Sequence, residues 1–109
     1  MIGTTHVGSA ADVPMLEGRA ATVDGRRIAV FRLDDGFAAV DHACPHAGGP
    51  LSDGIVAAGC VTCPLHGLRF DLYTGVAANG DARVAVHEVV ERNGELYVRL
   101  AAVEMRPAA

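Results

Sequence analysis

The sequence has 109 residues, of which 50% are hydrophobic, 20% charged and 5% aromatic. That length fits one domain, since domains run to about 100–200 residues. The hydrophobic content is too high for a disordered chain. The formal net charge is −4 and the nine basic residues are all arginines standing singly or in pairs, which argues against a nucleic-acid-binding surface.

Nothing in the sequence predicts insertion into a membrane or export across one. No apolar run approaches the roughly 18 residues of a membrane span, because Arg, Asp or Gly interrupts each run. The first residues lack a basic region followed by an apolar segment, so no secretory signal is expected. Three cysteines cannot all pair, and in a reducing compartment cysteine is more often a metal ligand than a crosslink. We therefore expect a cytoplasmic protein with a single domain over residues 1–109.

The predicted elements are short strands joined by tight turns. In chain order, the strand-like runs are 20–23, 26–33, 37–40, 55–56, 60–62, 84–90 and 96–100. Asp24-Gly25, Asp35-Gly36 and Asn93-Gly94 separate neighbouring runs, and such pairs predict hairpins because glycine accepts the positive φ of a tight turn. No segment keeps a helical period over three turns, so we expect an all-β, antiparallel sandwich or barrel.

Two segments between these strands contain cysteine and histidine, residues that a turn does not require. The first contains Cys44-Pro45-His46 and the second, after sixteen intervening residues, Cys63-Pro64-Leu65-His66. Thiolate and imidazole are ligands of zinc and iron, and a proline after each cysteine stiffens its loop. Two cysteines and two histidines on paired loops could hold one tetrahedral Zn²⁺, or a [2Fe–2S] cluster with both cysteines on one iron and both histidines on the other.

The spacing resembles that of the Rieske [2Fe–2S] family. Cys-x-His followed by Cys-x-x-His is the pattern of that family, whereas zinc ribbons usually place their ligands in Cys-x-x-Cys pairs. The likeness continues through residues 49–52 and 69–75 and covers most of the chain, from about Val7 to Leu100. It implies the Rieske fold, an antiparallel β-sandwich with a small cluster-binding subdomain formed by the two loops.

The resemblance also implies the ligands. Cys44 and Cys63 would bind the buried iron through sulfur, and His46 and His66 would bind the outer iron through nitrogen. Replacing two thiolates by neutral imidazoles makes the site less negative and raises the reduction potential, which in Rieske centres spans about −150 to +300 mV.

Four further positions predict where in that range the potential lies. High-potential Rieske proteins carry an additional pair of cysteines, which forms a disulfide, and a serine and a tyrosine that donate hydrogen bonds to sulfur. The corresponding residues here are Gly49, Leu65, Leu68 and Phe70. None of them can form a disulfide or donate a side-chain hydrogen bond to sulfur. Donors to sulfur stabilise the more negative reduced state, so their loss predicts a potential at the low end.

The short chain has no room for a separate catalytic domain, so we expect a one-electron carrier rather than an enzyme. The resemblance implies a ferredoxin that passes electrons from an NAD(P)H-dependent reductase to a terminal oxygenase. An alternative is the small Rieske-like subunit of an NAD(P)H-dependent nitrite reductase, bound to its large subunit. A structural zinc module is a third possibility. Cys60 is expected to be buried and inert, His42 to be no ligand, and His87 to be a strand-face residue without a functional role.

Overall fold

The computed structural model describes residues 4–44, 48–65 and 67–101. Its strands are β1 (Thr5–Ser9), β2 (Gly18–Val23), β3 (Arg26–Leu33), β4 (Gly36–Asp41), β5 (Ile55–Ala57), β6 (Cys60–Thr62), β7 (Arg69–Asp71), β8 (Val86–Arg92) and β9 (Glu95–Arg99). The helical segments in these residues are two short 3₁₀ turns, η1 (Ala10–Asp12) and η2 (Leu51–Asp53). Within the same residues, no helix has the length and apolar character needed to cross a membrane.

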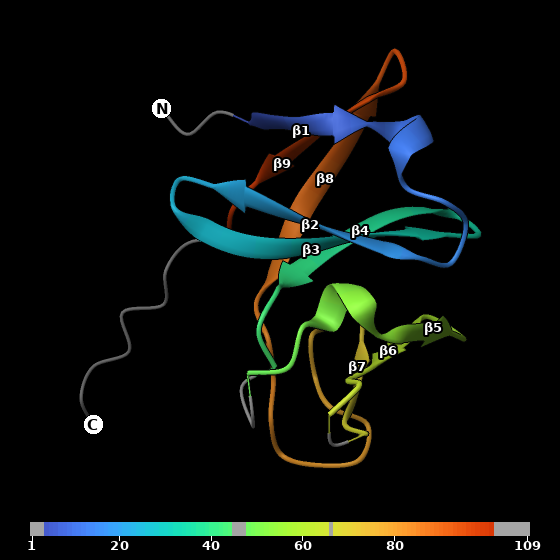
Figure 1. Ribbon diagram of the computed structural model, residues 1–109, viewed down its shortest axis with the longest axis vertical. Coiled ribbons are helices and arrows are strands. Elements are labelled where there is room, and N and C mark those ends of the chain that lie inside the picture. The colour runs from blue at the N-terminus through green and yellow to red at the C-terminus, as the bar shows by residue number, and fades with distance from the viewer. Residues whose placement is uncertain (1–3, 45–47, 66, 102–109) are drawn as a thin grey trace.

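Six strands form one antiparallel sheet in the order β1-β9-β8-β4-β3-β2, here called the base (Figure 1). The predicted hairpins β2–β3 and β8–β9 are confirmed. Their turn residues Asp24-Gly25 and Asn93-Gly94 have φ values of 50° and 81°, and of 56° and 79°. Two successive positive φ angles are the geometry that Asp-Gly and Asn-Gly favour in a two-residue hairpin.

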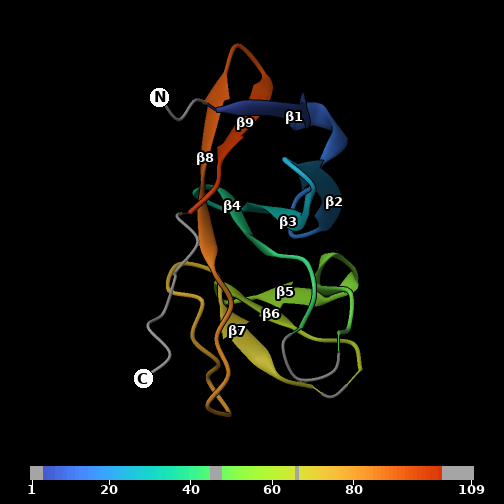
Figure 2. The ribbon, with the colours of Figure 1, turned by 90° about the vertical axis from the view of Figure 1, so that its left-hand side faces the viewer.

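The chain leaves the base after β4 and returns to it at β8. Between them, the described residues of the range 42–85 form a second layer, here called the loop half, which contains η2 and the antiparallel sheet β5-β6-β7. Figure 2 shows the base and the loop half stacked on each other. The all-β fold class expected from the sequence is confirmed.

Strand β3 is buried on both of its faces, which alternation alone does not predict. Ile28 and Val30 belong to a core inside the base, whereas Ala29, Phe31 and Leu33 belong to a second core. That second core also contains residues of the loop half. The central strands of the base therefore bury apolar side chains on both faces, and the loop half packs on one of these faces.

Candidate metal centre

The sequence segments 44–46 and 63–66 are here called the two cysteine boxes. Their cysteines lie in the core shared by the base and the loop half. Cys44 and Cys63 are each 1% exposed, and both are free thiols. Their neighbours in this core include Leu51, Phe70 and Leu72, all buried. A thiol in such surroundings is packed like a small apolar side chain unless it binds a metal.

The first cysteine begins a tight loop that closes on itself. The backbone N–H of Cys44 donates to the carbonyl of Gly49 at 2.9 Å, and the N–H of Gly48 donates to the carbonyl of Cys44 at 2.6 Å. Gly48 has a φ of +73°, a conformation that glycine adopts without steric cost. Residues 45–47, which include the predicted ligand His46, lie outside the described residues.

The second loop repeats the same hydrogen-bonding pattern. The N–H of Cys63 donates to the carbonyl of Leu68 at 2.7 Å, and the N–H of Gly67 donates to the carbonyl of Cys63 at 3.1 Å. Gly67 has a φ of +76°. The predicted ligand His66 lies outside the described residues. In both loops, then, a glycine four positions after the cysteine turns the chain back over the cysteine carbonyl.

The first loop packs directly on the sulfur of the second. A Cβ atom added at Gly49 would lie 2.7 Å from Cys63 Sγ and 3.1 Å from Leu65 Cγ. Any larger residue at position 49 would collide with the thiol. The structure thus brings the two loops together as predicted and places Cys63 against the loop that Cys44 begins.

Within the described residues, Cys60 and His42 form no metal-holding group with this pair. Cys60 is partly exposed on β6 rather than buried, because it alternates with the buried Val61. His42 has a pKa lowered by burial and by the neighbouring Arg27 guanidinium, against an opposing effect of Asp53. The Nδ1 atom of His42 is buried and has no hydrogen-bond partner among the described atoms.

Sequence reasoning missed one residue that contacts the second loop. The side-chain oxygen of Asn79 accepts a hydrogen bond from the N–H of Arg69 at 2.9 Å, and its amide nitrogen donates to the carbonyl of Gly67 at 3.1 Å. An antiparallel bridge between Phe70 and Ala77 places the chain that leads to Asn79 beside β7. The Asn-Gly dipeptide at 79–80 marks a turn, which is the signal that could have directed attention to it.

The described donors fit a metal group that takes two thiolates. Within the described residues no group of three or more His, Cys, Asp or Glu side chains surrounds a single point, as expected where both predicted histidines lie outside that part of the chain. What the described atoms supply is two buried free thiols on loops of equal construction, with a glycine where a side chain would fill the space beside one sulfur.

The sequence is similar to a known domain family and to several known proteins. Residues 3–93 match the model of the Rieske [2Fe-2S] domain. The chain is 35% identical over 82 residues to ferredoxin CarAc of Metapseudomonas resinovorans, a match over 73% of this chain and 77% of that protein. It is 47% identical over 57 residues to the anthranilate 1,2-dioxygenase ferredoxin subunit of Burkholderia cepacia, where the match spans 51% of this chain and 53% of the relative.

Solved structures share the fold over nearly the whole chain. One is a complex of reduced oxygenase and oxidised ferredoxin in carbazole 1,9a-dioxygenase, with a TM-score of 0.81, 31% identity and coverage of 88% of this chain and 92% of the matched chain. Another is a putative NADH-dependent nitrite reductase small subunit from Mycobacterium tuberculosis, with a TM-score of 0.86, 28% identity and coverage of 94% and 99%.

Proposed function

The chain belongs to the Rieske [2Fe-2S] domain family, and from that membership we propose that it is a one-electron carrier that serves an oxygenase. A Rieske domain holds a single [2Fe–2S] cluster, which when bound supplies the ability to take up and release one electron. The observation that carries the proposal is the pair of buried, free cysteines on two loops with matching hydrogen bonds, one loop packed on the sulfur of the other.

The proposed ligands come from both loops. Cys44 and Cys63 would hold the group through sulfur, and His46 and His66 through imidazole nitrogen. Burial of the two thiols keeps water from the sulfur side, and the loop glycines keep the backbone close to it. Two thiolates and two imidazoles could bind either a zinc ion or a [2Fe–2S] cluster. The family match supports the cluster over the zinc module.

We place the reduction potential at the low end of the Rieske range. Positions 49 and 65 offer no cysteine for a disulfide, and Leu68 and Phe70 offer no hydroxyl. Phe70 is fully buried and Leu68 is packed against the same core as the thiols. Only backbone N–H groups are then left to stabilise the reduced state at those positions, which suits a carrier reduced through a nicotinamide-dependent reductase.

A partner would dock where the loops reach the surface. Leu65 lies over Gly49 and is 57% exposed, so it offers an apolar contact beside the proposed ligands. We propose that the reductase and the terminal oxygenase use this end in turn, in the cytoplasm, since a carrier must release one partner before it meets the next.

The second candidate is the small subunit of a nitrite reductase. The observation in its favour is the fold similarity to the putative nitrite reductase small subunit, which extends over 94% of this chain. That role requires a lasting complex with a large subunit, whereas the carrier role requires a free protein. Size-exclusion chromatography of the native protein with its cellular partners separates the two roles.

The proposed function is tested on the purified chain. We expect visible absorption, acid-labile sulfide, and an electron-spin signal that appears on reduction. Cys44→Ser and His66→Ala should lose the sulfide, whereas Cys60→Ser, which alters a thiol outside the site, should keep it. A colourless protein that holds one zinc ion, or a Cys44→Ser variant with normal sulfide content, would refute the proposal.

A further inference from the structure

Two chain segments connect the base to the loop half, and they cross side by side. The outgoing segment passes Asp41 and the returning segment passes Ala85, and the N–H of Asp41 donates to the carbonyl of Ala85 at 3.1 Å. These two crossings are here called the neck. Whatever fixes the neck also fixes the start of the first loop, because Cys44 follows Asp41 by three positions.

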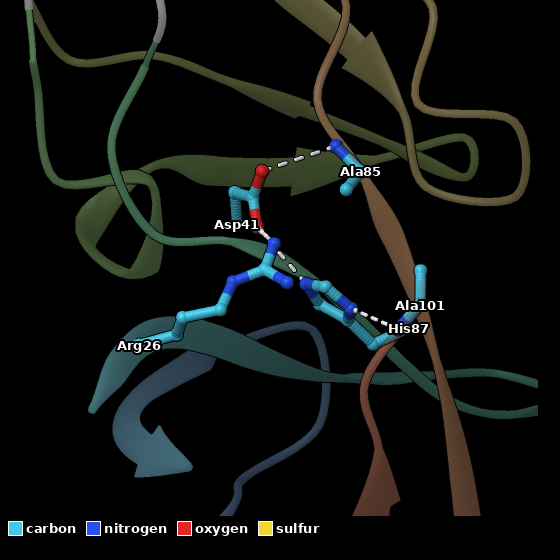
Figure 3. A network of polar contacts seen from close by, with 5 residues as sticks. All are labelled: Arg26, Asp41, Ala85, His87 and Ala101. Atoms are coloured by element: carbon cyan, nitrogen blue, oxygen red, sulfur yellow. Dashed lines mark hydrogen bonds and ion pairs between the residues drawn. The ribbon is translucent and has the colours of Figure 1, made fainter. Parts of the chain in front are cut away.

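The carboxylate of Asp41 crosslinks the neck and ties it to the base. Oδ2 accepts a hydrogen bond from the N–H of Ala85 at 3.3 Å, and Oδ1 accepts from Arg26 Nη2 and from His87 Nε2, each at 2.9 Å. Figure 3 shows the carboxylate between Arg26 of β3, Ala85 and His87 of β8. Hydrogen bonds to a charged group are stronger than those between neutral groups.

His87 is buried, and its two hydrogen-bond partners indicate the tautomer of its ring. It is the one buried polar side chain of the described residues, with 0% of that side chain exposed. Its Nδ1 accepts a hydrogen bond from the N–H of Ala101 at 2.9 Å, so that atom carries no proton. The ring proton is therefore on Nε2, where it is donated to Asp41 Oδ1, and both polar atoms of the buried ring are satisfied.

We propose that His87 is a positioning residue that orients the Asp41 carboxylate to hold the neck closed and so fixes the first loop. Without the His87 bond, Oδ1 has only the long Arg26 side chain, 32% exposed, to orient it. Beyond Asp41 the restraint continues through the backbone, since the N–H of His42 donates to the carbonyl of Arg27 and the N–H of Leu51 donates to the carbonyl of His42.

Two substitutions at His87 separate its two hydrogen bonds. His87→Gln places an amide nitrogen near the former Nε2 and keeps a donor for Asp41, but loses the acceptor for Ala101. His87→Asn places its polar atoms near the former Nδ1, and so keeps an acceptor for Ala101 but loses the donor to Asp41. Asp41→Asn, at a partly exposed position, keeps one acceptor oxygen and loses the charge. With that oxygen facing the donors of Arg26 and His87, the amide NH2 faces Ala85 and its N–H has no side-chain acceptor. This variant serves if the buried variants do not fold.

The first measurement is amide hydrogen exchange at Ala85 in the full-length chain. We expect exchange about tenfold faster or more in His87→Asn and in Asp41→Asn, as the loss of a hydrogen bond to a charged group requires, and near-normal exchange in His87→Gln. His6→Asn and His6→Gln, made at an exposed histidine of β1, are the matched controls and should change nothing at Ala85.

The second measurement is the midpoint potential, which a purely structural role would not move. This expectation rests on the proposed function. A looser first loop holds its backbone N–H donors less firmly near sulfur, so the midpoint potential of His87→Asn should fall, while that of His87→Gln should stay unchanged. Unchanged exchange and potential in His87→Asn, or a larger effect in His87→Gln, would overturn the proposal. Wild-type protein without labile sulfide would overturn the carrier function, yet the exchange comparison would still decide the role of His87.

Discussion

Replacing Gly49 by alanine tests the contact between the two loops. The added Cβ would lie 2.7 Å from Cys63 Sγ, with Leu65 Cγ and Cδ1 at 3.1 and 3.2 Å. The sulfur contact is about 1 Å closer than the 3.5–4.0 Å of ordinary packing. Because β2 and β3 pack against η2, which directly follows the first loop, that loop has little room to move away from the added Cβ. Overpacking of this kind costs about 1–3 kcal/mol.

Gly48→Ala is the matched control. Its Cβ would meet no described atom within 4 Å, but its φ of +73° strains any residue other than glycine by about 1–2 kcal/mol. Both variants should therefore unfold at a lower temperature, whereas only Gly49→Ala presses on the sulfur of Cys63, a proposed ligand. We expect iron to leave Gly49→Ala about tenfold faster, a ratio that corresponds to about 1.4 kcal/mol. Bleaching of visible absorption in the presence of a chelator measures it, and equal rates in the two variants would refute the reasoning.

Three further predictions concern the surroundings of the site. Asn79→Ala removes the hydrogen bonds to Gly67 and Arg69 and should lower the free energy of unfolding by about 1 kcal/mol, measured by denaturant titration. It should also release iron faster, measured by bleaching with a chelator; normal iron retention would contradict this role. Tyr73 has a pKa raised above 10.0, chiefly by its hydrogen bond to Asp35, so the fold holds this proton more tightly than the unfolded chain does. That contribution is complete below pH 10 and is lost as the pH rises through the raised pKa; Tyr73→Phe should remove this part of the alkaline loss of stability, and an unchanged alkaline profile would count against the bond. Phe70→Ala, at a fully buried ring, should cost about 3–5 kcal/mol in denaturant unfolding, and a loss below 1 kcal/mol would mean that the core closes around the gap.

Local chemistry made much of this protein predictable from its sequence. The hairpins at Asp24-Gly25 and Asn93-Gly94 follow from turn residues whose backbone preference acts over two positions. The two cysteine boxes are also local, since residue type and spacing suffice to mark them, and the family match agrees with that interpretation. Strands β1 and β7 carry no such local signal. The pairing of β1 shifts register between His6 and Gly8, and β7 is joined to β6 through the second cysteine loop rather than by a two-residue turn.

The tertiary structure alone decided how the boxes are held. That Gly49 lies on Cys63 Sγ, that Asn79 clasps the second loop, and that His87 is buried against Asp41 are contacts between residues far apart in the chain. No periodicity encodes them, because each depends on the register of the strands and on how the loop half packs on the base. The sequence by itself predicts which side chains could bind iron, because residue type and spacing are local. The packing of the two halves determines where Cys44 and Cys63 are held.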